Sequence, residues 1–595
     1  MKKFYFTLLA LVACTLTHAA TQIQVGDLWF ELGNTTAKVI ADMSGSKTNY
    51  ATLTEAVIPS SVTYDSYTYP VTSIGTSAFE NSPKLQSVTI PSSVTTINQD
   101  AFYGCSKLSN VSLPEGLTTI NQRAFCGCNL KDITIPSTVT TIGNAAFKSN
   151  PTTSVLWKPV TCSISSDASA PFYSESSQIT SFSFGDKVET IPAYLCKHMS
   201  KLDTVVLPPS VKFLGQAAFM YCTSLKSINL PKTQKTLPAS FLEGCTSLES
   251  IELPATLTTI SYSAFYNCSK LSNVTLHEGI TTIEDVAFWG CNLKDITIPS
   301  TVTSIGSGAF KGNPTTSVTW LPATCSIGTD ASAPFYSTSS TITSFTFGDK
   351  VQIIPAYLCK NMSKLETVVI PPTVTNIYRN AFMYCTALQS FEFPEGLVTV
   401  ATSVLEGCTA LKKVVIPESV TSINQDAFYG CSGLQEIYNY AITPQSIDAR
   451  SVYNVDKSTC TLYVPIDYIE LYKAANVWKE FLNIIGVTTG LHFEEQNVQV
   501  SYLKEDQSLY FMETQTWQVP LAPRIDGYTF LKWEVLAGDL ADGIVLQAVY
   551  EQDDPTKVEQ VTNNQSPITN KLLRRGNVYV LRDDELFTIT GQKVK

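Results

Sequence analysis

Charge is scarce in this sequence, and the scarcity restricts its partners. Asp, Glu, Lys and Arg make up only 15% of its 595 residues, the formal net charge is −11, and no block of lysine and arginine occurs. Basic patches are the electrostatic footprint of proteins that bind nucleic acids or anionic membranes. We therefore expect neither of these as a partner.

Catalytic signatures are lacking as well. The sequence contains no G-x-S-x-G, H-E-x-x-H, phosphate-loop or dinucleotide-binding string. Two of its four histidines, His198 and His277, fall in a long internal duplication whose other copy has Asn361 and Pro114 in their places. The acidic residues show no spaced pair for glycoside hydrolysis, although folding can bring distant carboxylates together. These observations predict that the chain is not an enzyme and uses no cofactor.

Metal-site spacings and membrane-spanning runs are also missing. No Cys-x-x-Cys pair occurs, and Cys126-Gly127-Cys128 has no second cluster to complete a zinc site. Beyond the N-terminus, no stretch reaches the roughly 18 apolar residues that a membrane-spanning helix needs. We therefore expect neither a metal site nor a transmembrane helix.

The long apolar run at the N-terminus predicts an export signal over residues 1–19, because two lysines precede the run and small residues follow it. Cleavage by ordinary signal peptidase is the preferred interpretation. A lipid anchor at Cys14 is the alternative, because Leu11-Val12-Ala13-Cys14 resembles a bacterial lipobox. In both cases we expect a protein at the cell surface or outer membrane, or outside the cell.

What the chain has in abundance is a short repeat. Hydrophobic residues make up 44% of the sequence, and Ser, Thr, Val and Ile are conspicuous, which favours strands over helices. An apolar residue, usually Phe preceded by Ala, returns about every 23 residues. The sixteen positions are Phe79, Phe102, Phe125, Phe147, Phe172, Leu195, Phe219, Phe241, Phe265, Phe288, Phe310, Phe335, Leu358, Phe382, Leu405 and Phe428.

Each repeat has the pattern of one coil of a solenoid. In the unit that begins at Leu85, Val88 and Ile90 alternate with polar residues as in a half-buried strand, and Pro91 ends the strand. Later apolar positions, through Phe102, point into the same interior if the chain turns back on itself. One unit cannot offset its own ordering entropy, so the units must stack, and we expect a parallel sheet along one side of the stack.

A longer period is superimposed on the short one. The strings that begin at Cys128 and Asp167 return at Cys291 and Asp330, an offset of 163 residues that corresponds to seven units. A third copy begins near Phe428, because the string INQDAFYGCS occurs at residues 97–106 and again at 423–432. The array therefore arose by duplication of a seven-unit block.

The unit L-x-x-V-x-I-P-x-x-V-x-x-I-x-x-x-A-F-x-x-C resembles the BspA-type leucine-rich repeat of bacterial surface proteins, over residues 70–451. The resemblance implies a mainly β, right-handed solenoid of about 16 coils of 22–25 residues. Residues 20–69 resemble the N-terminal cap of such arrays. Residues 452–487 resemble their closing segment, in which a short helix covers the last coil.

The cysteines are expected to be buried thiols and not disulfides. The position three residues after Phe is filled by Cys in most units, but by Ser82, Asn150 and Asn313 in others. A disulfide half cannot be replaced in this way without leaving its partner unpaired. Cys, Ser and Asn share small size and some capacity for hydrogen bonding, which suits a buried turn position.

The outward positions of the strands form the candidate binding face. They are small, polar and of mixed charge, which favours either a solvated sheet face or an extended docking surface for a protein. Trp157 and Trp320 are equivalent at the offset of 163 and either fill gaps in longer coils or, if exposed, stack on a sugar. The charged and amide candidates are Lys131, Asp132, Lys226, Asn229, Glu249, Glu252, Lys294, Asp295, Glu366, Glu392, Lys412 and Lys413.

Beyond the array, the pattern changes to alternating strands. Residues 488–552 resemble the internalin-type B repeat, a small β-grasp-like surface module, and residues 553–567 have the composition of a linker. Residues 568–595 predict a hairpin that turns at Asp583-Asp584. It resembles the terminal hairpin of exported proteins of the Bacteroidetes, somewhat like a truncated sorting tail, and could equally add a strand to the preceding module.

Three functions are compatible with these features. The first is a non-enzymatic surface or secreted protein that adheres to host matrix proteins or other cells, where the family resemblance supplies the adhesion. The second is glycan capture for a saccharide uptake system, which requires Trp157 and Trp320 to be exposed. The third is a passive stalk that displays the C-terminal module.

Overall fold

The computed structural model describes residues 21–44, 49–164, 170–172, 178–328, 333–335 and 341–487, and seven strands between residues 499 and 588. The predicted export signal, Cys14 and the 553–567 linker lie outside the described residues. The chain divides into two compact units, Met1–Thr488 and Thr489–Lys595. The first unit is the repeat array.

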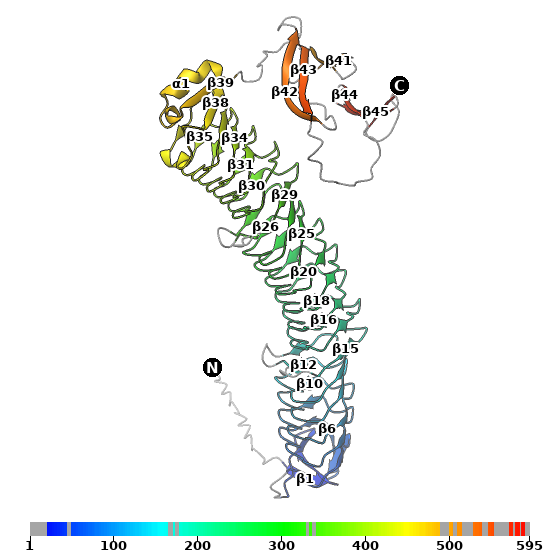
Figure 1. The fold of residues 1–595 in the computed structure, drawn as a ribbon. Helices are drawn as coiled ribbons and strands as arrows, with labels where there is room; N and C mark the ends of the chain where they lie inside the picture. Colours follow the sequence, from blue (N-terminus) through cyan, green and yellow to red (C-terminus); the bar gives the residue numbers. More distant parts are fainter. Residues whose placement is uncertain are drawn as a thin grey trace, which may run out of the picture. The chain divides into compact units, whose positions relative to one another are not determined.

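The first unit is a stack of about 17 turns, in which each coil pairs with the next through parallel strands (Figure 1). We number the coils 1 to 17 from β4 and call the surface formed by the first strand of each coil the strand face. Coil 14, at residues 365–370, has no regular strand. The strands of this face are β4 (Glu55–Val57), β7 (Ser87–Thr89), β9 (Asn110–Ser112), β11 (Asp132–Ile135), β13 (Ser154–Trp157), β15 (Ser181–Phe184), β17 (Thr204–Val205), β19 (Ser227–Ile228), β21 (Ser250–Ile251), β23 (Asn273–Val274), β25 (Asp295–Ile298), β27 (Ser317–Trp320), β29 (Ser344–Phe347), β32 (Ser390–Glu392), β34 (Lys413–Ile416) and β36 (Glu436–Asn439).

A second set of short parallel strands lies later in the coils, in most of them after a Pro, so the prediction of one sheet was incomplete. These strands contain Val-x-x-Ile, whose polar pair is mostly threonine, and Thr hydroxyls donate to the preceding coil, as Thr118 does to the Thr95 carbonyl oxygen at 3.0 Å. We call this surface the second face. Its strands are β6 (Tyr67–Ile74), β8 (Thr96–Ile97), β10 (Thr119–Ile120), β12 (Thr141–Ile142), β14 (Ser163–Ile164), β16 (Thr190–Ile191), β18 (Phe213–Leu214), β20 (Thr236–Leu237), β22 (Thr259–Ile260), β24 (Thr282–Ile283), β26 (Ser304–Ile305), β28 (Ser326–Ile327), β30 (Ile353–Ile354), β31 (Asn376–Ile377), β33 (Thr399–Val400), β35 (Ser422–Ile423) and β37 (Ser446–Ile447).

The repeated Phe side chains form continuous stacks inside the solenoid. Phe79 and Phe102 are 5.0 Å apart between ring centroids and nearly coplanar, at 3°, and Phe265 and Phe288 repeat this arrangement at 5.0 Å and 14°. Each of these rings is fully buried. The stacks follow from the repeat itself, because identical residues in neighbouring coils lie one strand spacing apart.

The predicted register is one residue wrong in three coils. In regular coils the Phe N–H donates to the carbonyl oxygen that precedes the next Phe, as Phe102 does to Ala124. In the irregular coils the same position is occupied by Cys196, Leu242 and Cys359, and not by the predicted Leu195, Phe241 and Leu358. The core accepts several apolar residues at either position, so the backbone hydrogen bonds decide which residue takes the Phe site.

Extra elements lie at both ends of the array. At the N-terminal end β1 (Thr21–Val25), β2 (Leu28–Leu32) and β3 (Ala37–Ile40) form an antiparallel sheet, and β3 pairs in parallel with β6, which also forms a hairpin with β5 (Ser61–Tyr64). The C-terminal end contains η3 (Ala449–Val452), β38 (Thr461–Pro465), η4 (Ile466–Tyr468), α1 (Ile469–Ala474), η5 (Trp478–Glu480) and β39 (Asn483–Val487).

Aromatic residues attach these ends to the coils. Tyr50 stacks on Phe79 at 4.9 Å. At the other end, the Tyr472 hydroxyl donates to the Ala441 carbonyl oxygen at 2.7 Å and the Trp478 indole N–H donates to that of Gln445 at 3.0 Å. Tyr472 lies in α1 and Trp478 in η5, within the segment predicted to contain a short helix.

The second unit contains two separate sheets. The first has the order β41-β40-β43-β42, made of β40 (Gln499–Leu503), β41 (Leu509–Glu513), β42 (Tyr528–Ala537) and β43 (Val545–Gln552). The second consists of β44 (Asn570–Arg574), β45 (Asn577–Arg582) and β46 (Glu585–Thr588), antiparallel in sequence order. The tail therefore has three strands and not the two of the predicted hairpin, and it pairs within itself.

Candidate binding surface

The strand face presents the predicted candidates to solvent. Lys131, Asp132, Lys226, Asn229, Glu249, Glu252, Lys294, Asp295, Glu366, Glu392 and Lys412 are all exposed. Lys413 is half-buried because its ammonium group lies over the Tyr438 ring, 4.8 Å from the centroid. The alternation of inward and outward positions in the strands was therefore assigned correctly.

One of these candidates has a structural role. The Asn229 side-chain oxygen accepts a hydrogen bond from the Leu207 N–H at 2.7 Å, and its amide donates to the Leu207 carbonyl oxygen at 2.9 Å. Asn229 therefore continues the pairing between coils 7 and 8 where β17 and β19 end. A ligand would have to compete with both bonds.

The strand face contains an opening between coils 10 and 11. β23 pairs with β21 and β25 pairs with β27, but among the described residues β23 and β25 do not pair with each other. A cavity of about 300 Å³ opens there, and Phe288 and Phe310 of the Phe stack contribute to its lining. Asp295 lies among the lining residues with Thr275 and Thr297. We call this cavity the notch.

A hollow of about 440 Å³ lies near the middle of the strand face. It is lined by Thr180, Lys201, Asp203, Ser224, Lys226 and Ser247, from four successive coils. The lining brings two lysines and an aspartate together. The hollow adds polar contacts to the central part of the face.

The C-terminal end of the strand face has an aromatic pair that the sequence analysis did not identify. Tyr438 and Tyr463 stack at 4.4 Å between centroids and 11°, and burial raises the pKa of Tyr438 to about 12. The signal was present in the alternation of Glu436–Asn439, in which Tyr438 takes an outward position.

The two equivalent tryptophans are buried, and the sugar-stacking interpretation of them was wrong. Trp157 and Trp320 both have 0% exposure. They occupy the inward positions at the ends of β13 and β27, where Trp157 packs against Phe182 at 6.4 Å. The alternative role predicted for them, filling the interior of longer coils, is confirmed.

The cysteines form a buried ladder of hydrogen-bond donors. The Cys105 thiol donates to the Phe79 carbonyl oxygen with an Sγ–O distance of 2.9 Å, and Cys268 donates to Leu242 at 3.1 Å. Asn150 donates from its amide to Phe125 at 2.7 Å, and Ser82 donates from its hydroxyl to Asn49 at 2.9 Å. One donor satisfies the carbonyl group of the preceding coil, which explains why Cys, Asn and Ser replace one another.

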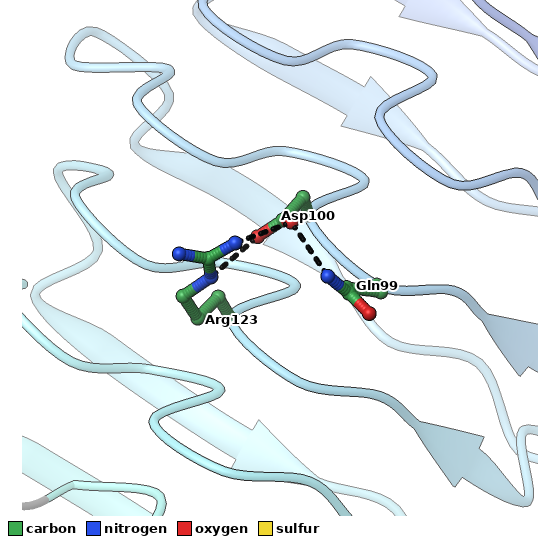
Figure 2. A network of polar contacts seen from close by, with 3 residues as sticks. All are labelled: Gln99, Asp100 and Arg123. Carbon is green, nitrogen blue, oxygen red and sulfur yellow. Dashed lines mark hydrogen bonds and ion pairs between the residues drawn. The ribbon is translucent and has the colours of Figure 1, made fainter.

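The turns around the A-F-x-G-C motif form a third surface, the turn ridge, at residues 100–105 and 123–128 and their equivalents. Figure 2 shows the Arg123 guanidinium facing the Asp100 carboxylate of the preceding coil, with bonds from Nε to Oδ1 at 2.8 Å and from Nη2 to Oδ2 at 2.7 Å. Gln99 donates to the same carboxylate at 3.0 Å. Arg450 and Asp426 repeat the ion pair at 3.1 Å, so the duplicated string INQDAFYGCS carries the same inter-coil contact twice.

Aromatic and cationic side chains also meet along the turn ridge. Lys311 lies over the Trp289 ring at 4.6 Å from the centroid, and His198 stacks on Tyr221 at 4.9 Å. These contacts join side chains of neighbouring coils. The sequence alone does not reveal these contacts, because the equivalent positions of other units hold polar residues.

In the described part of the chain, no group of three or more His, Cys, Asp or Glu side chains is placed to hold a metal ion. No helix there is long and apolar enough to cross a membrane.

The family model described as the BspA type leucine rich repeat region matches residues 49–154, 72–202, 189–317 and 326–459, which together make up more than half of the chain. The chain belongs to the BspA-type leucine-rich repeat family. This assignment agrees with the mainly β solenoid and its repeated Phe and Cys ladders. No curated protein matches this BspA-type chain significantly.

Several solved structures are similar to it. A leucine-rich repeat protein from Bacteroides ovatus is 24% identical, with a TM-score of 0.45, and the match covers 74% of this chain and 99% of that chain. A leucine rich cell surface protein from Faecalibacterium prausnitzii is 23% identical, with a TM-score of 0.26 and coverage of 80% and 100%. The pneumococcal vaccine antigen PcpA is 17% identical, with a TM-score of 0.27 and coverage of 79% and 99%.

Proposed function

We propose that this BspA-type chain is a non-enzymatic binding protein of the cell surface or of the secreted fraction, which adheres to matrix proteins or other cells through the strand face. The observation that carries the proposal is the strand face itself. Its charged candidates are exposed along coils 4 to 16, and a notch and a polar hollow interrupt it. Solenoid repeats generally bind over extended surfaces of this kind.

The other two functions have less support. Glycan capture depended on exposed tryptophans, and Trp157 and Trp320 are buried. A passive stalk would need no hollows in its strand face, whereas two are present. In the proposal, the segments at both ends of the array cap it, and the second unit is an appended B-repeat-like module. The predicted export signal and the family support a location outside the cytoplasm.

The test is binding of the purified exported protein to a panel of immobilised matrix proteins and to whole cells. Lys226→Glu with Lys294→Glu reverses two charges on the strand face. Lys232→Glu with Lys235→Glu makes the same charge change on exposed lysines beside the second face and serves as the matched control. We expect the first pair to weaken binding at least about tenfold, since each reversal also creates repulsion, and the second pair to leave it unchanged. Equal effects of the two pairs would refute docking through the strand face.

A further inference from the structure

We infer that the strand face binds a second copy of this chain, with the two arrays antiparallel and face to face. The inference rests on the proposed use of the strand face for protein docking and names the partner. It is argued from three features of that face: a pair of exposed valines, the notch with its equivalent site in the first block, and the order of charges along one column.

The exposed valines are equivalent residues of the two duplicated blocks. Val206 in coil 7 is 75% exposed and Val369 in coil 14 is 82% exposed. Both occupy the third outward position of the strand, which is polar in most other coils. A lone exposed valine needs no explanation. Val57 of coil 1 shares this column and is 61% exposed, but Val206 and Val369 also take the same place in the two duplicated blocks and so form a regular feature.

The residues that line the notch recur in the first block. The notch between coils 10 and 11 contains Val274, Leu276 and Ile296, and Val111, Leu113 and Ile133 are their equivalents between coils 3 and 4. There too, β9 pairs with β7 and β11 pairs with β13, without pairing between β9 and β11 in the described sheets. Val111 and Leu113 are only partly buried, as are Val274 and Leu276. At both sites, the coil that contains the string CNLKDITI is one residue shorter than the regular repeat.

The valines alternate with the notch and its equivalent site along the face. The order is the equivalent site at coils 3/4, Val206 at coil 7, the notch at coils 10/11 and Val369 at coil 14. Each interval is three and a half coils, or about 17 Å at a strand spacing of ~4.8 Å. A two-fold axis along the strand direction, at coil 9, reverses the coil order. It places Val206 of one copy within half a coil of the notch of the other, and Val369 within half a coil of the equivalent site.

The charges of the first outward column follow the same symmetry. The axis places Asp203 of coil 7 beside Lys294 of coil 11 in the second copy, and Lys131 of coil 4 beside Glu366 of coil 14. Near the axis the Glu249 carboxylates of the two copies meet, and Lys226 of both copies flanks them. Opposite charges on facing surfaces suppress wrong registers and speed association.

A parallel arrangement lacks these contacts. Equal coils would then face each other, so that Val206 would face coil 7 and not the notch, and Lys294 would face coil 11 and not Asp203. The antiparallel register is therefore the one that the face fits, and an interface of this isologous kind closes at two copies. Antiparallel pairing would also suit molecules presented by two opposing cells.

The experiment is sedimentation equilibrium of the exported full-length protein with charge-reversal variants. Asp203 and Lys294 are four coils apart, about 19 Å, so they do not pair within one chain. We expect Asp203→Lys and Lys294→Asp to weaken dimerisation at least about tenfold each, and the double variant to restore it, because each copy then carries the complementary charges. Val206→Asp with Val369→Asp should give a monomer of unchanged Tm, since both residues are exposed.

A wild-type protein that stays monomeric up to about 100 μM, which corresponds to a standard free energy weaker than about −5.5 kcal/mol, overturns the inference. A dimer that the double variant does not restore overturns the antiparallel register. Binding to matrix proteins, measured on the same samples, separates the two proposals. A monomer that still binds matrix proteins and loses binding with Lys226→Glu keeps the proposed function and removes the homodimer. A restored dimer without matrix binding keeps the homodimer and removes matrix adhesion.

Discussion

The Tyr221 ring occupies the space above Gly244 of the next coil, so that a Cβ atom built on Gly244 would overlap Tyr221 Cδ1. Tyr384 and Gly407 repeat the relationship one block later. The Tyr221 hydroxyl reaches on to the Glu243 carboxylate at 3.0 Å. A tyrosine at this position of the turn ridge leaves no room for a Cβ atom in the following coil. The positive φ of that following residue also favours glycine.

Gly244→Ala should destabilise the array more than Gly430→Ala. Both glycines have positive φ, 71° and 73°, which costs an alanine about 1–2 kcal/mol. The Cβ of Gly430→Ala would have its nearest neighbour at 3.7 Å, whereas that of Gly244→Ala displaces the Tyr221 ring. Thermal unfolding should show the larger drop in Tm for Gly244→Ala. Adding Tyr221→Ala should remove most of the difference, and equal Tm losses for the two glycine variants would show that the ring contact is unimportant.

The thiol ladder should make stability fall at alkaline pH. Burial raises the pKa of Cys105, Cys222, Cys268, Cys385 and Cys431 to about 12, against about 8.5 in an unfolded chain. The stabilisation is therefore complete below about pH 8.5 and is lost as the pH rises towards 12. Tm measured from pH 7 to 11 should decline, and Cys→Ser at these positions should flatten the decline. A thiol reagent at neutral pH should label them only after unfolding.

Phe288→Ala should be among the most damaging single changes in the array. The ring is fully buried and stacks on Phe265 at 5.0 Å and Phe310 at 5.4 Å, so its loss should cost about 3–5 kcal/mol. Phe213→Ala is the control, because that ring is 64% exposed, and its change should stay within about 0.5 kcal/mol. Urea unfolding midpoints would rank the two, and similar midpoints would contradict the inward assignment of the Phe stack.

The buried tryptophans should be unresponsive to sugars. Trp157 and Trp320 have no exposed surface. When both are changed to Phe, the fraction of native tryptophan emission that acrylamide quenches should therefore rise, and the emission maximum should shift to the red. The fluorescence that Trp157 and Trp320 contribute is measured as the difference between wild type and the double variant. Saccharides should leave this difference unchanged. A sugar-induced change in that difference would revive glycan binding at these sites.

The repeat made much of this fold predictable. The alternation in Leu85–Ile90 located the strands, and the exchange of Cys105 for Asn150 indicated a buried donor position, because both features report only local backbone geometry and burial. The same logic placed Lys131 and Glu249 on the outside. It failed at Phe241, where two adjacent apolar residues fit the Phe site equally well and only the hydrogen bonds of the next coil distinguish them.

The candidate surface was less predictable than the coils. The second face was missed because its two-residue strands, such as Thr96–Ile97, are too short to show alternation. The notch was missed because it depends on how the shortened coil at Leu293 sits against Leu276, which no single unit contains. The turn ridge contacts between Arg123 and Asp100 likewise join residues 23 positions apart.

The sequence by itself determined the unit, its number of repetitions to within one coil and which residues point inwards, since these follow from a period and from the burial of apolar side chains. The tertiary structure decided what lies on the outside. Four features are relations between coils: the pairing of backbone groups, the space for Tyr221, the separation of β23 from β25 and the charges that share a column. Stacking brings together residues that are neighbours only across a full repeat, so their contacts depend on the exact length and register of every coil between them.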